Sequence, residues 1–204
     1  MTNLKQNVDD IYSKGFNSAE QSNSVYNQWA EYDEQVLGEG RWTGHSMGAS
    51  YVIWNYTPDV RVCDLGCGTG AVGKLLKTAN YNRVWGFDIS KTMIVKAMPY
   101  YKDVQLINIV EQPYPGEYDV VTAIGVFTKG HLDATPLENL SKCLVSKGKI
   151  CTTTPITIND YNYEEYAGWN KQTLFTKILE KPFNSWYENG KQYQHNFCVW
   201  EKNE

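Results

Sequence analysis

The chain has 204 residues, a formal net charge of -4, a hydrophobic share of 42% and a charged share of 21%. This length and composition predict one globular domain with a buried core, and they exclude disordered, collagen-like and coiled-coil chains. The mild acidity argues against a protein that grips a phosphate backbone, because such domains usually carry a basic face. We therefore expect no nucleic-acid partner.

Five cysteines are spread along the chain, at positions 63, 67, 143, 151 and 198. Their odd number and the chain length do not fit a small disulfide scaffold. No second Cys/His pair stands at ligand spacing from Cys63 and Cys67, so we expect no metal site. Residues 1–10 have no apolar signal core, and the longest apolar run, Val120–Phe127, is too short to span a bilayer. These features predict reduced thiols, a cytoplasmic protein and no membrane partner.

Three helices are expected before residue 58. An apolar spacing within residues 8–16 indicates the first, Val25–Leu37 the second and Met47–Tyr56 the third. The third is expected to end where Thr57 precedes Pro58. A glycine-rich loop around Trp42 separates the second helix from the third.

Strands and helices then alternate. Strands are expected over Arg61–Leu65, Arg83–Phe87, Val104–Val110, Tyr118–Ile124 and Lys149–Thr154, and helices over Gly73–Ala79, Lys91–Tyr100 and Pro136–Leu144. The near-continuous apolar character of the fourth strand is typical of the centre of a parallel sheet. The alternation predicts a doubly wound α/β fold with right-handed crossovers.

The last segment departs from this alternation. We expect a helix over Tyr161–Lys181, because aromatic residues recur in it every three positions. Two extended segments, Pro182–Glu188 and Lys191–Lys202, flank Asn189-Gly190, which is a strong hairpin signal. The whole chain therefore predicts a Rossmann-like sheet of seven strands, mostly parallel, with a C-terminal antiparallel hairpin.

The loop after the first strand is the most informative segment. Asp64 is followed by Gly66, Gly68 and Gly70, which places bare backbone and a helix N-terminus at the sheet edge where such folds bind ligands. A dinucleotide fingerprint is a competing interpretation, because Gly66, Gly68 and Ala71 fit its looser form. A carboxylate is repelled by a pyrophosphate and attracted by a cationic amino acid, so Asp64 favours the second kind of ligand.

Two further strand ends extend this site. Asp88 follows the second strand, where a carboxylate can accept hydrogen bonds from ribose hydroxyls. Asn108 and Ile109 follow the third strand, where an amide can meet the edge of an adenine. A carboxylate, a ribose clamp and an adenine slot without a phosphate site indicate S-adenosylmethionine.

Three ordered motifs resemble those of class I S-adenosylmethionine-dependent methyltransferases: DLGCGTG at 64–70, GFDIS at 86–90 and YDVV at 118–121. The resemblance covers about residues 26–154. It implies a helical lid over residues 1–57, within the same domain as a methyltransferase core at 58–204. The predicted cofactor-binding residues are Tyr32, Asp64, Gly66, Cys67, Gly68, Gly70, Asp88, Ile89, Asn108, Ile109 and Gly125.

Finer features are similar to the methyltransferase-like 27 group, named for the Williams–Beuren region. These are YNQWAEYD at 26–33, GHL at 130–132 and KGKICTTT at 147–154. The sequence departs from the wider family at Asn108, where Asp is common.

The methyl acceptor is expected beyond the fourth strand. His131 follows that strand and is the predicted catalytic base, because an imidazole can take a proton near neutral pH. A helix-capping or surface role is its alternative. Trp42, His45, Phe127 and Tyr161 are the predicted substrate-binding residues, although the aromatic ones also fit a helix face or a core.

The predicted function is transfer of a methyl group to N, O or S of a small molecule, with a protein acceptor left open. Three alternatives compete with it. A non-catalytic module would bind the cofactor and regulate a partner, an aminopropyltransferase would need several acidic residues in its pocket, and an NAD-dependent oxidoreductase would use the looser glycine pattern. The sequence does not indicate an oligomeric state.

Overall fold

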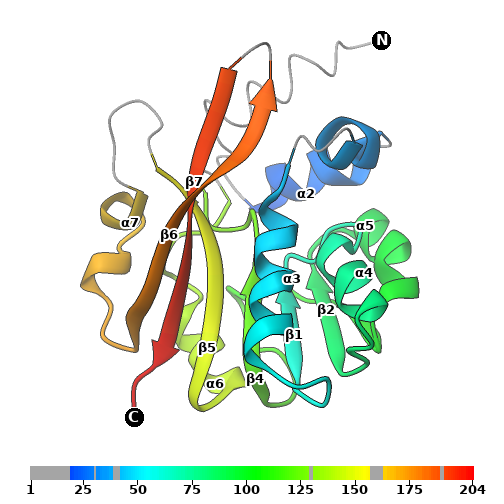
Figure 1. Ribbon diagram of the computed structural model, residues 1–204. Helices are drawn as coiled ribbons and strands as arrows, with labels where there is room; N and C mark the ends of the chain where they lie inside the picture. Colours follow the sequence, from blue (N-terminus) through cyan, green and yellow to red (C-terminus); the bar gives the residue numbers. More distant parts are fainter. Residues whose placement is uncertain (1–18, 30, 39–41, 129–130, 157–162, 189–190) are drawn as a thin grey trace.

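The structure of the protein is a computed structural model, shown in Figure 1. It describes residues 19–204 except 30, 39–41, 129–130, 157–162 and 189–190. The helix expected within residues 8–16 and the predicted substrate residue Tyr161 lie outside the described residues.

Seven strands form one sheet in the order β3-β2-β1-β4-β5-β7-β6. The strands are β1 (Val62–Leu65), β2 (Val84–Asp88), β3 (Asp103–Leu106), β4 (Tyr118–Ala123), β5 (Leu144–Pro155), β6 (Phe175–Glu188) and β7 (Lys191–Lys202). Strands β1 to β5 pair in parallel, and β7 runs antiparallel to both β5 and β6. This confirms the predicted sheet and its antiparallel C-terminal pair.

Helices cover both faces of the sheet. Successive strand residues point to opposite faces, so the apolar side chains on each face need their own helices to bury them. The helices after the first strand are α4 (Ala71–Thr78), α5 (Lys91–Ala97) with the turn η3 (Met98–Tyr100), and α6 (Leu137–Cys143). Val62 packs in one core with residues of α3 (Gly44–Asn55) and α4, whereas Cys63 packs in a second core with residues of α6. The described part of the chain contains no helix long and apolar enough to cross a membrane.

The N-terminal segment differs from the expected single helix over Val25–Leu37. Helix α2 (Ala19–Gln28) ends earlier, and a π-helical turn, η1 (Asp33–Leu37), follows. Between them Trp29 is buried in a small cluster with Val36 and residues of the loop and of β6. Trp29 therefore packs into this cluster and does not extend the helix face of α2, so α2 and η1 are separate elements.

The helix expected over Tyr161–Lys181 is wrong. A single turn, α7 (Tyr163–Tyr166), and the turn η4 (Trp169–Lys171) precede β6, which already begins at Phe175. Gly168 stands between the two turns with φ +80, a left-handed conformation that interrupts a helix. The residues expected as the end of the helix instead pair with β7, and the expected strand Pro182–Glu188 is only the second half of β6.

Helix α2 lies at the end of the sheet where the parallel strands terminate (Figure 1). The β6–β7 pair continues past this edge, so its far part stands beside the N-terminal segment (Figure 1). Backbone contacts join the two: Trp42 forms a β-bridge with Trp186, and the Thr43 N–H donates to the Ser185 carbonyl at 3.0 Å. Segments from both ends of the chain therefore meet at the carboxyl edge of the sheet.

Candidate functional site

A cavity of about 160 Å³ opens at this carboxyl edge. Its lining from the core is Leu65, Gly66, Gly68, Asp88, Ile89, Met93, Ile107, Asn108, Ile109, Tyr114, Ile124, Gly125, Val126, Thr128, His131, Leu132, Thr153 and His195. Its lining from the N-terminal segment is Ser22, Tyr26, Trp29, Tyr32, Val36 and Trp42. The cavity therefore brings together most of the predicted cofactor residues with His131 and Trp42.

The glycine loop requires glycine for two different reasons. Gly66 has φ +62, and a Cβ there would lie 2.5 Å from Val126 Cγ2. Gly68 has φ +53, and a Cβ there would meet nothing within 4 Å. Gly68 thus leaves bare backbone facing open space at the cavity wall. Gly70, with φ +96, comes directly before α4 and does not line the cavity. A Cβ at Gly70 would lie 2.7 Å from the Tyr100 ring.

Asp88 stands at the end of β2 and lines the cavity. Its carboxylate accepts the Gly68 N–H at 2.9 Å and the Ser90 N–H at 2.8 Å. Burial raises the pKa of Asp88, while these backbone hydrogen bonds act in the opposite direction. The two bonds hold the Asp88 carboxylate against the glycine loop, so Asp88 and Gly68 form one continuous part of the cavity lining.

Asp64 does not line this cavity. It is 1% exposed and accepts hydrogen bonds from Thr122 Oγ1 at 2.6 Å and Tyr101 Oη at 2.5 Å. Burial raises the pKa of Asp64 to about 6. With Cys67 and His45 it lines a smaller cavity of about 50 Å³, which shares Gly66 and Gly68 with the larger one.

The predicted adenine side is formed by the segment after β3. Ile109 is buried, and Ile89, Asn108 and Ile109 all line the larger cavity. The Asn108 amide donates to Glu111 Oε1 at 3.0 Å, and its oxygen accepts the Val110 N–H at 3.1 Å. The Asn108 side chain therefore organises its own turn as well as lining the cavity.

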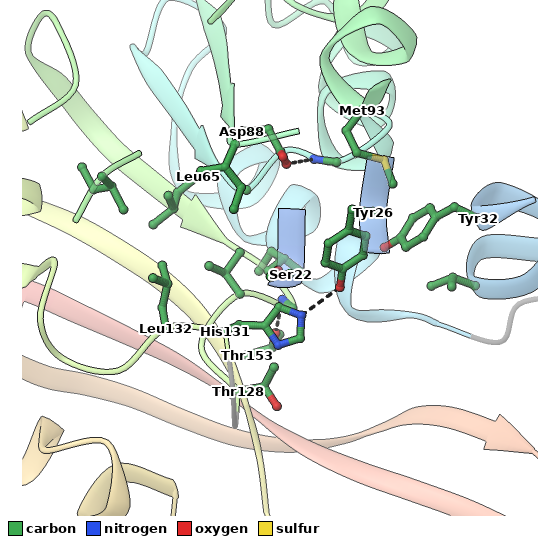
Figure 2. A pocket seen from close by; sticks show the side chains of 18 of the residues that line it. Ser22, Tyr26, Tyr32, Leu65, Asp88, Met93, Thr128, His131, Leu132 and Thr153 are labelled. Carbon is green, nitrogen blue, oxygen red and sulfur yellow. Dashed lines mark hydrogen bonds between the residues drawn. The ribbon is translucent and has the colours of Figure 1, made fainter. Parts of the chain in front are cut away.

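His131 contacts the N-terminal segment directly. Its Nε2 lies 2.8 Å from Tyr26 Oη, and Figure 2 shows the Tyr26 hydroxyl directed at the imidazole. The Tyr26 ring also meets Trp29 at a centroid distance of 6.0 Å and Tyr32 at 5.9 Å. An aromatic wall from α2 and the following turn thus lies opposite the glycine loop.

The predicted substrate residues have different surroundings in the structure. Trp42 lines both cavities and packs edge-on against His195, with ring centroids 5.1 Å apart. His45 belongs to the smaller cavity, and burial lowers its pKa. Phe127, expected to contact the acceptor, instead lies fully buried in the core, where its ring meets Trp169 at 4.8 Å.

Sequence reasoning missed several residues of the cavity, notably Tyr26, Tyr114, Thr153 and His195. A signal existed for His195. In the antiparallel pairing of β5 and β7, His195 lies opposite Pro155, the last residue of β5. Residues at that strand end face the ligand-binding edge of the sheet. Tyr26 gave no comparable signal, because its partner His131 is 105 positions away.

The charge of the larger cavity is simple. Asp88 is the one Asp, Glu, Lys or Arg among its described lining residues.

Outside this cavity, Glu164, Glu180 and Cys198 lie close enough to share a cation. The Lys177 ammonium already contacts both of these carboxylates, at 2.7 Å and 2.6 Å.

Comparisons with known proteins agree with this geometry. A family model described as a methyltransferase domain matches residues 57–197. A curated human protein, methyltransferase-like protein 27, is 27% identical over 111 residues, which are 51% of this chain and 44% of that protein. The chain therefore matches less than half the length of this curated relative.

Solved structures share the fold at low sequence identity. A magnesium protoporphyrin IX methyltransferase from Synechocystis PCC 6803, with bound SAM, has a TM-score of 0.65 at 16% identity, over 89% of this chain and 95% of that one. A TehB-like SAM-dependent methyltransferase from Corynebacterium glutamicum has a TM-score of 0.65 at 15% identity, over 88% and 99%. The [4+2]-cyclase SpnF has a TM-score of 0.69 at 12% identity, over 92% and 97%.

Proposed function

Because the chain belongs to the S-adenosylmethionine-dependent methyltransferase family, we propose that it methylates O, N or S of a small molecule. The observation that carries this proposal is one cavity whose two halves have different chemistry. One half is the glycine loop with Asp88, and the other half is an aromatic wall with two histidines. A cofactor and an acceptor would meet between these halves.

The first half fits the cofactor. Open space over Gly68 admits a ligand against the backbone, and Asp88 stands beside it. Ile89, Asn108 and Ile109 would hold the adenosine end, and Tyr32 would cover it. S-adenosylmethionine, when bound, supplies a methyl group on a cationic sulfonium, for which nearby aromatic faces are favourable neighbours.

The chain's own contribution is to orient the acceptor, exclude water and remove a proton. Orientation alone can supply several kcal/mol of barrier reduction, about 7 kcal/mol in favourable cases. Tyr26 Oη lies 2.8 Å from His131 Nε2. His131 Nε2 would take the acceptor's proton after the acceptor displaces the Tyr26 hydroxyl from this position. Tyr26, Trp29 and Trp42 would keep bulk water from the reacting atoms.

We propose that the N-terminal segment, residues 1–57, acts as a lid. Its described part is attached to the core at loops that border the cavity. Thr69 Oγ1 of the glycine loop donates to Asp33 at 2.5 Å, and Ser90 Oγ donates to Asn27 at 2.8 Å. A cavity of about 160 Å³ lined by aromatic side chains favours a small acceptor over a protein side chain, although a protein acceptor stays an alternative.

Five buried thiols, which form no disulfide, support a cytoplasmic location.

A thermal-shift measurement tests the cofactor, with S-adenosylmethionine, S-adenosylhomocysteine and NAD side by side. Ligand at a hundred times its Kd adds about 2.7 kcal/mol to the folded state, or on the order of 5–10 °C for a domain of this size. We expect a shift with both sulfur ligands and none with NAD. A folded sample that responds to neither sulfur ligand, or to NAD instead, would contradict the proposal.

A second candidate is a non-catalytic module that binds the cofactor and regulates a partner. The cavity size favours it, because about 160 Å³ is small beside ligand pockets of about 300 Å³ and more. The likeness to a [4+2]-cyclase also shows that this fold accommodates proteins with a different named activity. In that case S-adenosylmethionine binds, and His131→Ala leaves the biological role intact.

A further inference from the structure

His195 forms a buried pair with a serine at the far end of the cavity. It lies in β7, is 7% exposed and lines the cavity that holds Asp88 and His131. Its Nδ1 lies 2.6 Å from Ser185 Oγ on β6, which is fully buried. The Ser185 hydroxyl in turn donates to the Tyr193 carbonyl at 3.1 Å.

This arrangement favours the tautomer of His195 that carries its proton on Nδ1. A serine hydroxyl has one hydrogen, and here it points to the Tyr193 carbonyl. Ser185 Oγ must therefore accept a hydrogen bond from Nδ1–H of His195. In the neutral imidazole the other nitrogen, Nε2, then presents a lone pair. No described side chain is hydrogen-bonded to Nε2.

We propose that His195 Nε2 is the hydrogen-bond acceptor that positions the methyl acceptor, and that this acceptor is an uncharged aromatic molecule with a hydroxyl group. This inference rests on the proposed function. The Trp42 ring lies 5.1 Å from the His195 ring, nearly perpendicular to it, and lines the same cavity, so an apolar aromatic surface accompanies the imidazole. A flat, apolar molecule with one O–H donor matches both features.

The charges of the cavity support the same class. The described lining has no lysine or arginine that would pair with a phosphate or a carboxylate on the ligand. Its single carboxylate, Asp88, lies in the half of the cavity that we propose for the cofactor, so the described lining leaves no acidic residue to pair with an alkylammonium group on the acceptor. A phenol is neutral at pH 7 and needs neither kind of partner.

The two histidines have different roles in this proposal. Burial lowers the pKa of His195 to about 4, so it stays neutral at pH 7 and is a weak base. A base works best when its pKa lies near the working pH. His195 is therefore an acceptor-binding residue and not the base. Because the hydroxyl has a single hydrogen, the O–H would rotate from His195 Nε2 to His131 Nε2, which takes the proton as the methyl group is transferred.

The first experiment reads the tautomer directly. Long-range ¹H–¹⁵N spectra of the histidine rings at pH 7 should show His195 protonated on Nδ1 alone. Ser185→Ala removes the partner that selects this form, and a mixture of tautomers should appear. A wild-type His195 protonated on Nε2 would overturn the inference.

The second experiment compares phenol with toluene, which has the same ring but no donor. Each is titrated against the wild-type protein with and without saturating S-adenosylhomocysteine, and binding is followed by protein NMR. One net hydrogen bond predicts that phenol binds about fivefold tighter than toluene. His195→Phe should remove this preference and leave the S-adenosylhomocysteine affinity unchanged, and Ser185→Ala should reduce it if His195→Phe fails to fold.

The outcomes separate the two proposals. Equal affinities for phenol and toluene in the wild-type protein, or a preference that survives in His195→Phe, would overturn the role of His195. Failure of S-adenosylhomocysteine to bind, with the phenol preference retained, would overturn the proposed cofactor and leave the role of His195 standing.

Discussion

Gly66 and Gly68 both adopt positive φ, yet a methyl group would have different surroundings at the two positions. A non-glycine residue in this conformation costs about 1–2 kcal/mol. At Gly66 the added carbon would also lie 2.5 Å from Val126 Cγ2, whereas at Gly68 it would enter open space. We expect Gly66→Ala to lower the free energy of unfolding by about 2–4 kcal/mol and Gly68→Ala by about 1 kcal/mol.

Urea denaturation of the two variants measures which one loses more free energy of unfolding. The affinity of each variant for S-adenosylmethionine measures the effect on binding. Gly68→Ala should weaken binding more than its small stability loss suggests, because its methyl group projects into the cavity. Equal losses of stability would show that Val126 moves aside freely.

Asp64 makes the stability of the protein depend on pH in an unusual direction. Burial raises its pKa from 3.8 to about 6, although Thr122 and Tyr101 hydrogen bonds lower it. The folded protein thus holds this proton more tightly than the unfolded chain does. Its stabilising effect is complete below about pH 4 and is lost as pH rises through 6, a change of about 3 kcal/mol.

Urea denaturation between pH 3 and pH 7 tests this sign in the wild-type protein and in Asp64→Asn. The variant should gain stability relative to wild type as pH rises. Asp119→Asn is the opposite control, because the Arg61 guanidinium holds the pKa of Asp119 below its usual value. Its loss of stability should be larger at pH 7 than at pH 3. A constant difference between Asp64→Asn and wild type would refute the argument.

At the scale of elements, α2 is attached to the core near its end, where Tyr26 bonds His131 and Asn27 bonds the start of α5. Asn27 Oδ1 accepts from Ser90 Oγ at 2.8 Å and from the Thr92 N–H at 3.3 Å. Asn27→Ala should therefore increase hydrogen exchange in residues 19–28 roughly tenfold, as expected for the loss of about two modest hydrogen bonds. The denaturation midpoint of the core should barely change.

Gln28→Ala is the matched control for this prediction. Gln28 is one position away, but among the described residues its side chain bonds Ser24, within the same helix. Hydrogen–deuterium exchange with mass spectrometry separates the peptides of α2 from those of β1 and β4. If exchange in those strands rose equally, α2 would be an integral part of the core and not a separate lid.

The parts of the fold that could be predicted from the sequence are those determined locally. The glycine loop and the second strand end are short contiguous patterns, and Asp88 lies at the predicted edge. The helix expected over Tyr161–Lys181 failed because the aromatic spacing did not reveal the destination of Trp169. That side chain is buried against Phe127 and Trp200, contacts that form only in the folded chain.

The candidate site follows the same division. Residues on the strand ends were predictable, because every parallel strand ends at one edge of the sheet. Tyr26 was not predictable, since its hydrogen bond to His131 crosses 105 positions. The placement of Phe127 in the core required Trp169 as its partner, and periodicity around Phe127 does not contain that information.

At the scale of the whole molecule, the five cysteines are distributed over both faces of the sheet and are all buried. Burial raises the pKa of each thiol, so little thiolate exists at neutral pH. A thiol reagent therefore reaches them only when the structure opens. Cys63, Cys143 and Cys151 lie within the two cores, so their labelling requires global unfolding.

We expect these three thiols to react together with an aromatic disulfide reagent, at a rate that rises with urea as steeply as global unfolding does. Cys67, which lines the smaller cavity beside the glycine loop, should react earlier through local opening, and S-adenosylhomocysteine should suppress this early phase. Asn82→Cys, at an exposed position, supplies the rate for a free thiol. Fast labelling of Cys151 without urea would mean that the sheet opens locally around β5, because Cys151 lies in both the β4–β5 and the β5–β7 ladders.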